Sequence, residues 1–179
     1  MWRNTPTRFG LTTRLLHWLM AALILTLLVL GTVLVRIQPD LSTLWLYGLH
    51  KTLGLCALTL ALIRLIWHRI SPTPAPIGPP NQWANRAARA VHVALYLLML
   101  AIPLSGWIAS SATGLDVVIF GQITLPAITH TSESLENAGF AIHGILTKLL
   151  MALLLAHIAG ASLRGLKHDG TLRRITKGS

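Results

Sequence analysis

Four long apolar runs divide the chain, and short polar or proline-rich connections separate them. The runs cover residues 12–35, 44–67, 88–111 and 139–163. A helix needs roughly 20 mostly apolar residues to cross the hydrocarbon core of a bilayer. Each run is long enough, although the second also contains His50, Lys51 and Arg64. The pattern predicts an all-α integral membrane protein, with a single membrane domain over residues 1–179 that forms a bundle of four transmembrane helices.

The connections between the runs differ in character. Residues 69–83 read RISPTPAPIGPPNQW, and so many prolines cannot continue a helix. Residues 113–137 form a longer connection that carries Phe120, Leu125 and Ile128 among polar residues. This mixture predicts a short helix that lies at the membrane interface.

The composition supports a membrane location. Hydrophobic residues make up 53% of the chain and charged residues only 11%, against roughly 25% charged residues in soluble domains. The net charge is +10. The basic residues lie at the ends of apolar runs and not on one soluble face, so the expected partner is membrane lipid and not nucleic acid.

The distribution of Lys and Arg predicts the orientation. Twelve basic residues lie in the two tails and the second connection, and three (Arg36, Lys51 and Lys148) lie toward the other side. Cytoplasmic loops are enriched in Lys and Arg. We therefore expect a multi-pass protein of the bacterial inner (plasma) membrane with both termini in the cytoplasm.

Histidines occur inside the apolar runs, where a polar ring is costly. His17 lies near the start of the first helix and His50 near the start of the second, while the fourth helix holds His143 and His157. His143 and His157 are fourteen residues apart, a rotation about 40° short of four full helical turns, so they share one helix face. The same spacing separates them by about 21 Å along the helix axis. With the expected orientation, His17 and His157 lie at an inner depth and His50 and His143 at an outer depth.

Two histidine pairs at two depths indicate two stacked haems. Neutral imidazole is an axial ligand for haem iron, and facing helices of a bundle commonly supply such ligands. The sequence contains no C-x-x-C-H motif, so covalent c-type attachment is excluded. The alternatives are hydrogen bonds between helices and a proton relay, but no Asp or Glu lies in the runs to accompany these rings. His68, His130 and His168 lie at helix ends or in loops and are expected to be ordinary interfacial residues.

One further histidine, His92, leaves an alternative open. It lies early in the third helix, about as deep from the cytoplasm as His157. Geometry alone allows it to replace His17 as a ligand, to hydrogen-bond a quinone carbonyl, or to bond to the backbone or to a haem propionate.

Three basic residues within the runs also suit a haem protein. Arg64 follows His50 by fourteen residues and therefore lies on the same face at the cytoplasmic end, where it can pair with propionates of the inner haem. Lys51 and Lys148 are expected near the outer pair, and Lys51 in particular can draw an anion toward the outer haem. The alternative for each is a side chain that reaches the headgroups.

Five stretches resemble the bacterial cytochrome b-561 family of di-haem membrane proteins. They are RLLHW (14–18), LHKTLGL (49–55), HVALYLLMLAIPLSGWIASSATG (92–114), FGQITLP (120–126) and HDGTLRR (168–174). The third stretch is the most specific, and together the matches cover nearly the whole chain. One departure is the segment GASLRGLKHDG (160–170), which lacks a His-His pair that family members often carry there.

The resemblance implies two haem b groups, with His17 and His157 on the inner iron and His50 and His143 on the outer iron. It also implies electron exchange with the quinone pool. Family members that resemble this short four-helix chain include a superoxide oxidase, which oxidises superoxide and reduces ubiquinone. We expect the same activity here, with superoxide or another electron donor acting at the outer face. The alternative is a cytochrome b anchor subunit that links a dehydrogenase or hydrogenase to the quinone pool.

Overall fold

The computed structural model of the chain describes residues 1–79 and 82–178. Within them, four helices are long and apolar enough to cross a membrane. They are α1 (Leu11–Leu34), α2 (Leu44–Ile70), α3 (Trp83–Ala112) and α4 (Glu133–Leu166). The prediction of a four-helix membrane bundle is therefore confirmed. The remaining elements are the strands β1 (Val117–Ile119) and β2 (Ile123–Leu125) and the short helix α5 (Thr171–Thr176).

Two helices begin earlier than their apolar runs. α4 starts six residues before residue 139, because Ser132 caps it by accepting a hydrogen bond from the N–H of Leu135 and because Glu133 and Glu136 lie in its first turn. Carboxylates favour a helix N-terminus electrostatically. α3 starts at Trp83, five residues before residue 88, without such a cap or carboxylate; Asn85 in its first turn donates instead to the carbonyls of Ile77 and Pro79.

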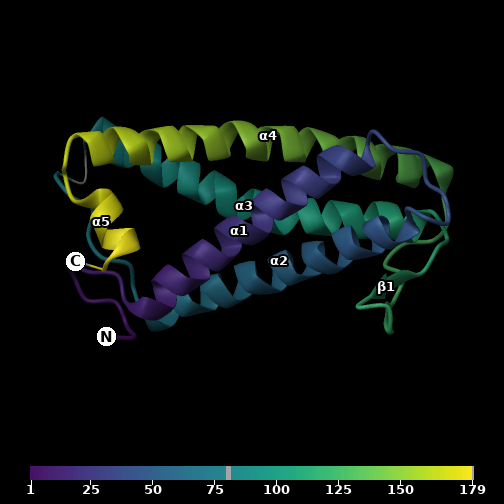
Figure 1. Cartoon of the computed structure of the whole chain (residues 1–179), viewed down its shortest axis with the longest axis horizontal. Coiled ribbons are helices and arrows are strands. Elements are labelled where there is room, and N and C mark those ends of the chain that lie inside the picture. Colours follow the sequence, from purple (N-terminus) through teal and green to yellow (C-terminus); the bar gives the residue numbers. More distant parts are fainter. Residues whose placement is uncertain (80–81, 179) are drawn as a thin grey trace.

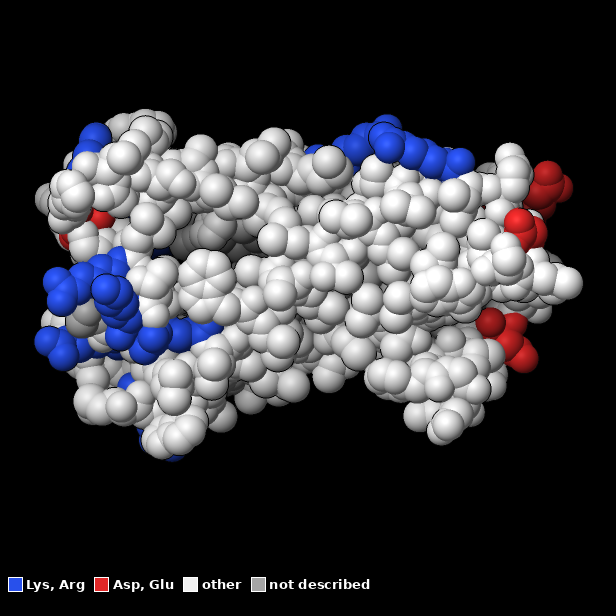
Figure 2. Space-filling view, viewed as in Figure 1, with Lys and Arg blue, Asp and Glu red and all other residues white. Residues whose placement is uncertain are grey.

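The bundle has two distinct ends (Figure 1). The terminal end holds both termini, α5 and the connection between α2 and α3, and the hairpin end holds β1, β2 and the connection between α1 and α2. α3 packs along α4, α1 packs against α2, and α2 packs against α3. Figure 2 shows most of the Lys and Arg side chains on this face at the terminal end and most of the Asp and Glu side chains at the hairpin end.

The packed core lies among α1, α2 and α3. Its buried members are Met20, Leu60, Ala61 and Met99. By contrast, the buried residues described for α4 are Gly139 and Leu150. A Cβ at Gly139 would lie 2.8 Å from that of Ala109, so α4 approaches α3 closely there.

The terminal end is held by side chains that bond to backbone carbonyls and hydroxyls. Asn4 accepts hydrogen bonds from the N–H of Gly10 (2.8 Å) and the hydroxyl of Thr13 (2.7 Å), and its N–H donates to Ser71 Oγ (2.9 Å). Arg174 of α5 donates to the carbonyls of Thr7 and Ala75. These bonds tie the N-terminal tail, the α2–α3 connection and α5 into one unit.

The connection between α3 and α4 contains a β-hairpin and not the interfacial helix expected there, so that prediction was wrong. β1 and β2 pair antiparallel, with Ile119 opposite Ile123. Phe120 and Gly121 have φ values of 52° and 68°, which is the backbone of a tight type I′ hairpin turn. β-branched residues dominate both strands, and such residues favour strands over helices.

A polar turn precedes α2 at the hairpin end. The carboxylate of Asp40 accepts hydrogen bonds from the Ser42 hydroxyl (2.7 Å) and from the backbone N–H groups of Ser42 (2.8 Å) and Thr43 (3.0 Å). These bonds, led by the one from the hydroxyl, lower the pKa of Asp40 below its usual value. The carboxylate therefore keeps its charge to a lower pH than a free aspartate does.

Candidate functional site: two histidine pairs

Two pairs of histidine rings face each other between helices that are not neighbours in the packed core. The terminal-side pair consists of His17 on α1 and His157 on α4, with ring centroids 6.2 Å apart. The hairpin-side pair consists of His50 on α2 and His143 on α4, with ring centroids 6.3 Å apart. Two metal–nitrogen bonds of about 2 Å each, plus the distance from each nitrogen to its ring centre, give a span of roughly 6 Å. Both pairs therefore have the spacing of two imidazoles on one metal ion.

His143 is oriented by hydrogen bonds through one of its nitrogens. Its Nδ1 lies 3.0 Å from the carbonyl oxygen of Ile102 and 3.1 Å from Oγ of Ser105. Because the carbonyl oxygen of Ile102 can only accept a hydrogen bond, Nδ1 must carry the proton and donate it there. A proton on Nδ1 leaves the lone pair of Nε2 free, which is the state of a metal-binding imidazole.

Glycines on neighbouring helices make room for the hairpin-side pair. A Cβ at Gly106 of α3 would lie 3.1 Å from Cε1 and 3.2 Å from Nδ1 of His143. A Cβ at Gly31 of α1 would lie 3.3 Å from Cε1 of His50. Nδ1 of His50 is buried and has no hydrogen-bond partner among the described residues. Both rings are thus held close to a helix backbone.

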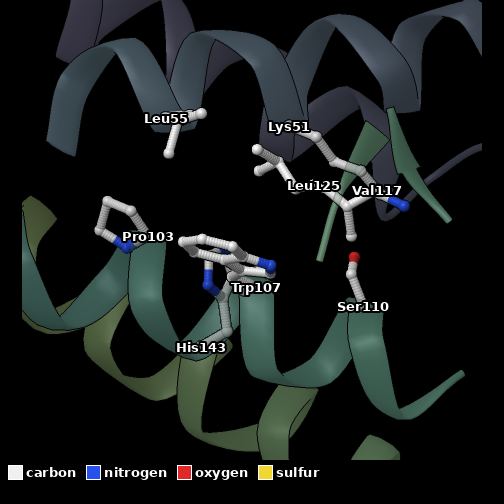
Figure 3. A pocket seen from close by; sticks show the side chains of 10 residues that line it. Lys51, Leu55, Pro103, Trp107, Ser110, Val117, Leu125 and His143 are labelled. Carbon is white, nitrogen blue, oxygen red and sulfur yellow. The ribbon is translucent and has the colours of Figure 1, made fainter. Parts of the chain in front are cut away.

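A cavity of about 70 Å³ adjoins the hairpin-side pair. His143 lines it together with Lys51, Gly54, Leu55, Pro103, Gly106, Trp107, Ser110, Val117 and Leu125. Figure 3 shows Lys51 and Leu55 on α2 across this space from Pro103 and Trp107 on α3, with His143 close to Trp107. Lys51 is half-buried and is the charged residue among those described as lining the cavity.

The hairpin closes one side of this cavity. Val117 of β1 and Leu125 of β2 belong to its lining. The N–H of Phe120, in the hairpin turn, donates to the hydroxyl of Thr52, the residue that follows Lys51 (3.2 Å). This hydrogen bond attaches the hairpin to α2 beside Lys51. The hairpin therefore borders the cavity on the side that faces the hairpin end.

The terminal-side pair has a third histidine beside it. His92 of α3 lies 5.1 Å from His157 between ring centroids, closer than His17 does. Arg64 of α2 is half-buried and lies within electrostatic reach of His17, His92 and His157. Figure 2 shows a hollow between α4 and α1 toward the terminal end, which is the side of the bundle where this pair lies.

The residues around both pairs fit a flat, iron-containing macrocycle. Neutral imidazoles are its usual ligands. Gly54 borders the cavity, and a Cβ there or at Gly144 would meet no atom within 4 Å, so the helix backbone is open to a planar group. Arg64 and Lys51 supply positive charge at the two depths, which suits a group that carries propionates.

Sequence reasoning missed two members of the site region and misplaced a third. His68, expected to be an ordinary interfacial residue, is hydrogen-bonded to the hydroxyl of Tyr96. The spacing of four residues from Arg64 to His68 and from His92 to Tyr96 is the signal that was available. Ser105 was not considered as a partner of His143. Lys148 is exposed on α4 and is not among the described residues that line the cavity beside His143, so the structure does not bring it to that pair.

Residues 8–178 match the family of prokaryotic cytochrome b561 proteins.

The chain belongs to this family.

Members of the cytochrome b561 family are membrane proteins that bind haem b and transfer electrons, so this chain is a redox protein of the bacterial membrane.

Individual relatives agree along the whole length of the chain. Cytochrome b561 homolog 2 of Escherichia coli (strain K12) is 32% identical over 180 residues, which cover 96% of this chain and 93% of that protein. Cytochrome b561 homolog 1 of the same strain is 29% identical over 177 residues, 94% of this chain and 96% of that protein. A protein of Yersinia pestis named probable superoxide oxidase CybB is 26% identical over 165 residues, 90% of this chain and 92% of that protein.

Proposed function

We propose that this cytochrome holds two haem b groups and moves electrons from superoxide at the outer face to ubiquinone. The observation that carries the proposal is the presence of two histidine pairs with ring centroids 6.2 and 6.3 Å apart. Each haem, when bound, would supply a one-electron redox centre. Two superoxide ions would give up one electron each, and one ubiquinone would take up both electrons and two protons.

The terminal-side haem would be held by His17 and His157, and the hairpin-side haem by His50 and His143. His92 is the weaker candidate for the terminal-side iron, because its ring lies 5.1 Å from that of His157, while two imidazoles on one metal ion require roughly 6 Å. Arg64 would face the propionates of the terminal-side haem. Two histidine ligands on each iron would favour electron exchange over oxygen binding.

The charge distribution supports the orientation. Arg3, Arg8 and Arg174 are among the basic residues of the terminal end, which Figure 2 shows as the more basic end of the molecule. Because basic segments remain in the cytoplasm, the terminal end would be cytoplasmic. The hairpin, Lys51 and the hairpin-side pair would then face the outside of a bacterial inner membrane.

Lys51 is the residue proposed to attract superoxide. Lys51 belongs to the lining of the cavity that His143 also lines, and it precedes Thr52, to which the hairpin is attached. A cation in a partly enclosed apolar cavity raises the local concentration of a small anion. Lys51 would therefore act on the rate at which superoxide reaches the hairpin-side site and not on the electron transfer that follows.

A Lys51→Ala variant tests this role. When superoxide is generated in the assay, we expect the rate of ubiquinol formation to fall about tenfold at low salt. The reason is that a charged cleft that attracts an anion raises the rate of encounter by 10-fold or more. The difference should shrink as salt is raised, since screening weakens the attraction. The measurement is the rate of quinol formation by purified protein in lipid vesicles over a series of salt concentrations.

The matched control is Lys148→Ala, which removes the same charge from an exposed position on α4. This control should retain the parent rate and the parent haem content. Equal rates for Lys51→Ala, Lys148→Ala and the parent protein at low salt would show that Lys51 does not guide the anion.

The acidic residues at the hairpin end favour a second candidate function. Asp40, Asp116, Glu133 and Glu136 are four of the five acidic residues in the chain, and they oppose a broad field that attracts an anion. The second candidate is a cytochrome b anchor that receives electrons from a dehydrogenase or hydrogenase at this face and passes them to quinone. It predicts co-purification with a soluble redox subunit and no quinol formation from superoxide.

A further inference from the structure

A histidine and a tyrosine form a half-buried polar pair between α2 and α3. Nε2 of His68 lies 2.7 Å from the hydroxyl oxygen of Tyr96, and the two rings meet edge to face with centroids 5.9 Å apart. Both side chains are half-buried, and Tyr96 packs against the core formed by Met20, Leu60, Ala61 and Met99. A tyrosine hydroxyl in apolar surroundings normally has a hydrogen-bond partner, and here that partner is a group that can carry a proton.

The second nitrogen of His68 is the unexplained part of this pair. Nδ1 of His68 is buried and has no hydrogen-bond partner among the described residues. His68 lies two residues before the end of α2, next to the polar network in which Asn4 bonds to Ser71. A buried polar atom without a partner is costly unless a water molecule completes it. Nδ1 is therefore the atom at which a water molecule from the terminal end would complete the hydrogen bonds of this pair.

Further contacts connect the His68–Tyr96 pair with the terminal-side histidines. Tyr96 follows His92 by four residues on α3, so the two share a helix face, and His92 lies 5.1 Å from His157. The guanidinium of Arg64 lies 5.3 Å from the centre of the Tyr96 ring. Arg64 on α2 is the charged group within electrostatic reach of both His68 and Tyr96. It is also within reach of His17, His92 and His157, and so links the pair to the terminal-side histidines.

From this arrangement we propose that His68 and Tyr96 relay the protons that quinone reduction consumes, from the terminal end to the depth of the terminal-side pair. This inference rests on the proposed reduction of ubiquinone. A protonated water molecule gives a proton to Nδ1 of His68 and becomes neutral water, the proton on Nε2 passes to the hydroxyl oxygen of Tyr96, and the original Tyr96 hydroxyl proton passes on to a quinone oxygen. The His68 ring then turns so that its remaining proton faces Tyr96 again, and a second transfer, with the second electron, completes the quinol.

A positive side chain beside the relay suits this role. Arg64 lies over the Tyr96 ring and disfavours a second positive charge on His68. The protonated histidine is therefore a short-lived state that gives its proton to Tyr96. Arg64 acts in this respect as a positioning residue, and the groups that hold the moving proton are His68 and Tyr96.

The test compares Tyr96→Phe with the parent protein. The substitution removes only the hydroxyl group, so the core contacts of the ring remain. We expect the rate of ubiquinol formation to fall at least about tenfold, because positioned proton donors contribute roughly 10²-fold or more. The solvent isotope effect on that rate should rise. Haem content and reduction of the haems by superoxide without quinone should match the parent.

His68→Gln provides a second variant. A glutamine side chain can hydrogen-bond to Tyr96 but cannot pass a proton from one nitrogen to another, so it should lose as much quinol formation as Tyr96→Phe does. Tyr47→Phe is the matched control, since the Tyr47 hydroxyl donates to the Leu34 carbonyl (3.3 Å) at the hairpin end. This control should retain the parent rate, isotope effect and haem content.

A measurement independent of turnover checks the pair itself. In protein labelled with nitrogen-15 at histidine, Tyr96→Phe should shift the signals of one histidine, His68, with or without haem. A parent rate of quinol formation in both Tyr96→Phe and His68→Gln over the whole pH range would overturn the relay. A loss confined to variants that also lose haem would overturn it too, because the pair would then be structural. If the parent protein forms no quinol at all, the proposed function fails instead.

Discussion

Replacing His143 by alanine should remove one of the two proposed haems from the protein and leave the other in place. The alanine cannot bind iron, and it also breaks the hydrogen bond from Nδ1 of His143 to the Ile102 carbonyl. The terminal-side pair shares α4 with His143 but lies fourteen residues away along it, roughly 21 Å along the axis. The haem content per chain, measured as the pyridine complex, should fall to about half of the parent value.

The control for this experiment is His130→Ala. His130 is exposed in the connection between the hairpin and α4, so its loss should leave the haem content and the reduced-minus-oxidised spectrum unchanged. A His143→Ala protein that keeps the full parent spectrum would contradict the assignment of the hairpin-side pair.

The same assay decides between His17 and His92 on the terminal side. We expect His17→Ala and His157→Ala each to remove the terminal-side haem, while His92→Ala retains it. The reason is that the ring of His17 has the 6.2 Å spacing from that of His157. The opposite result, with haem lost from His92→Ala and kept in His17→Ala, would assign His92 as the ligand.

Much of the fold and the facing of the histidines could be predicted because a bilayer leaves few choices. Apolar runs of the required length must be helices, since backbone groups in lipid have to bond within their own segment. Once the helices alternate in direction, the residue number fixes the depth of each side chain. That is why His17 and His157 were expected at one depth and His50 and His143 at another. A spacing of fourteen residues also fixes a common helix face without any knowledge of packing.

What could not be predicted depends on the rotation of each helix about its own axis. Lys148 has a suitable depth for the hairpin-side pair, but it lies exposed on α4. His92 and His17 share a depth, and only the distances to His157 separate them. The pairing of Tyr96 with His68 likewise depends on which faces of α2 and α3 meet.

The hairpin was missed for a different reason. Its turn depends on positive φ values at Phe120 and Gly121, and phenylalanine adopts that conformation rarely. The strands are three residues long, too short for an alternating pattern to stand out. Their stability comes from burial of Val117 and Ile119 and from the bond between Phe120 and Thr52, which are tertiary contacts.

Gly106→Val should remove the hairpin-side haem although Gly106 cannot bind iron. A Cβ at this position would lie 3.1 Å from Cε1 of His143, closer than normal carbon contacts of about 3.5–4.0 Å, and the valine methyl groups extend further. The ring has to move away, and its bond to Ile102 is lost with it. Overpacking of this kind costs about 1–3 kcal/mol. A redox titration followed by absorbance should show one haem component in place of two.

Gly160→Val is the matched control, because a Cβ at Gly160 of α4 would meet no atom within 4 Å. It should keep both components, which separates the clash at His143 from the general effect of valine in a helix. A double variant decides whether Gly106 acts through the histidine. If it does, Gly106→Val combined with His143→Ala should lose no more haem than His143→Ala alone, since two changes in one interaction are not additive. Additional loss of the terminal-side haem in the double variant would mean that the valine deforms the bundle as a whole, and that Gly106 is a packing residue of α3 and not a support for the ligand.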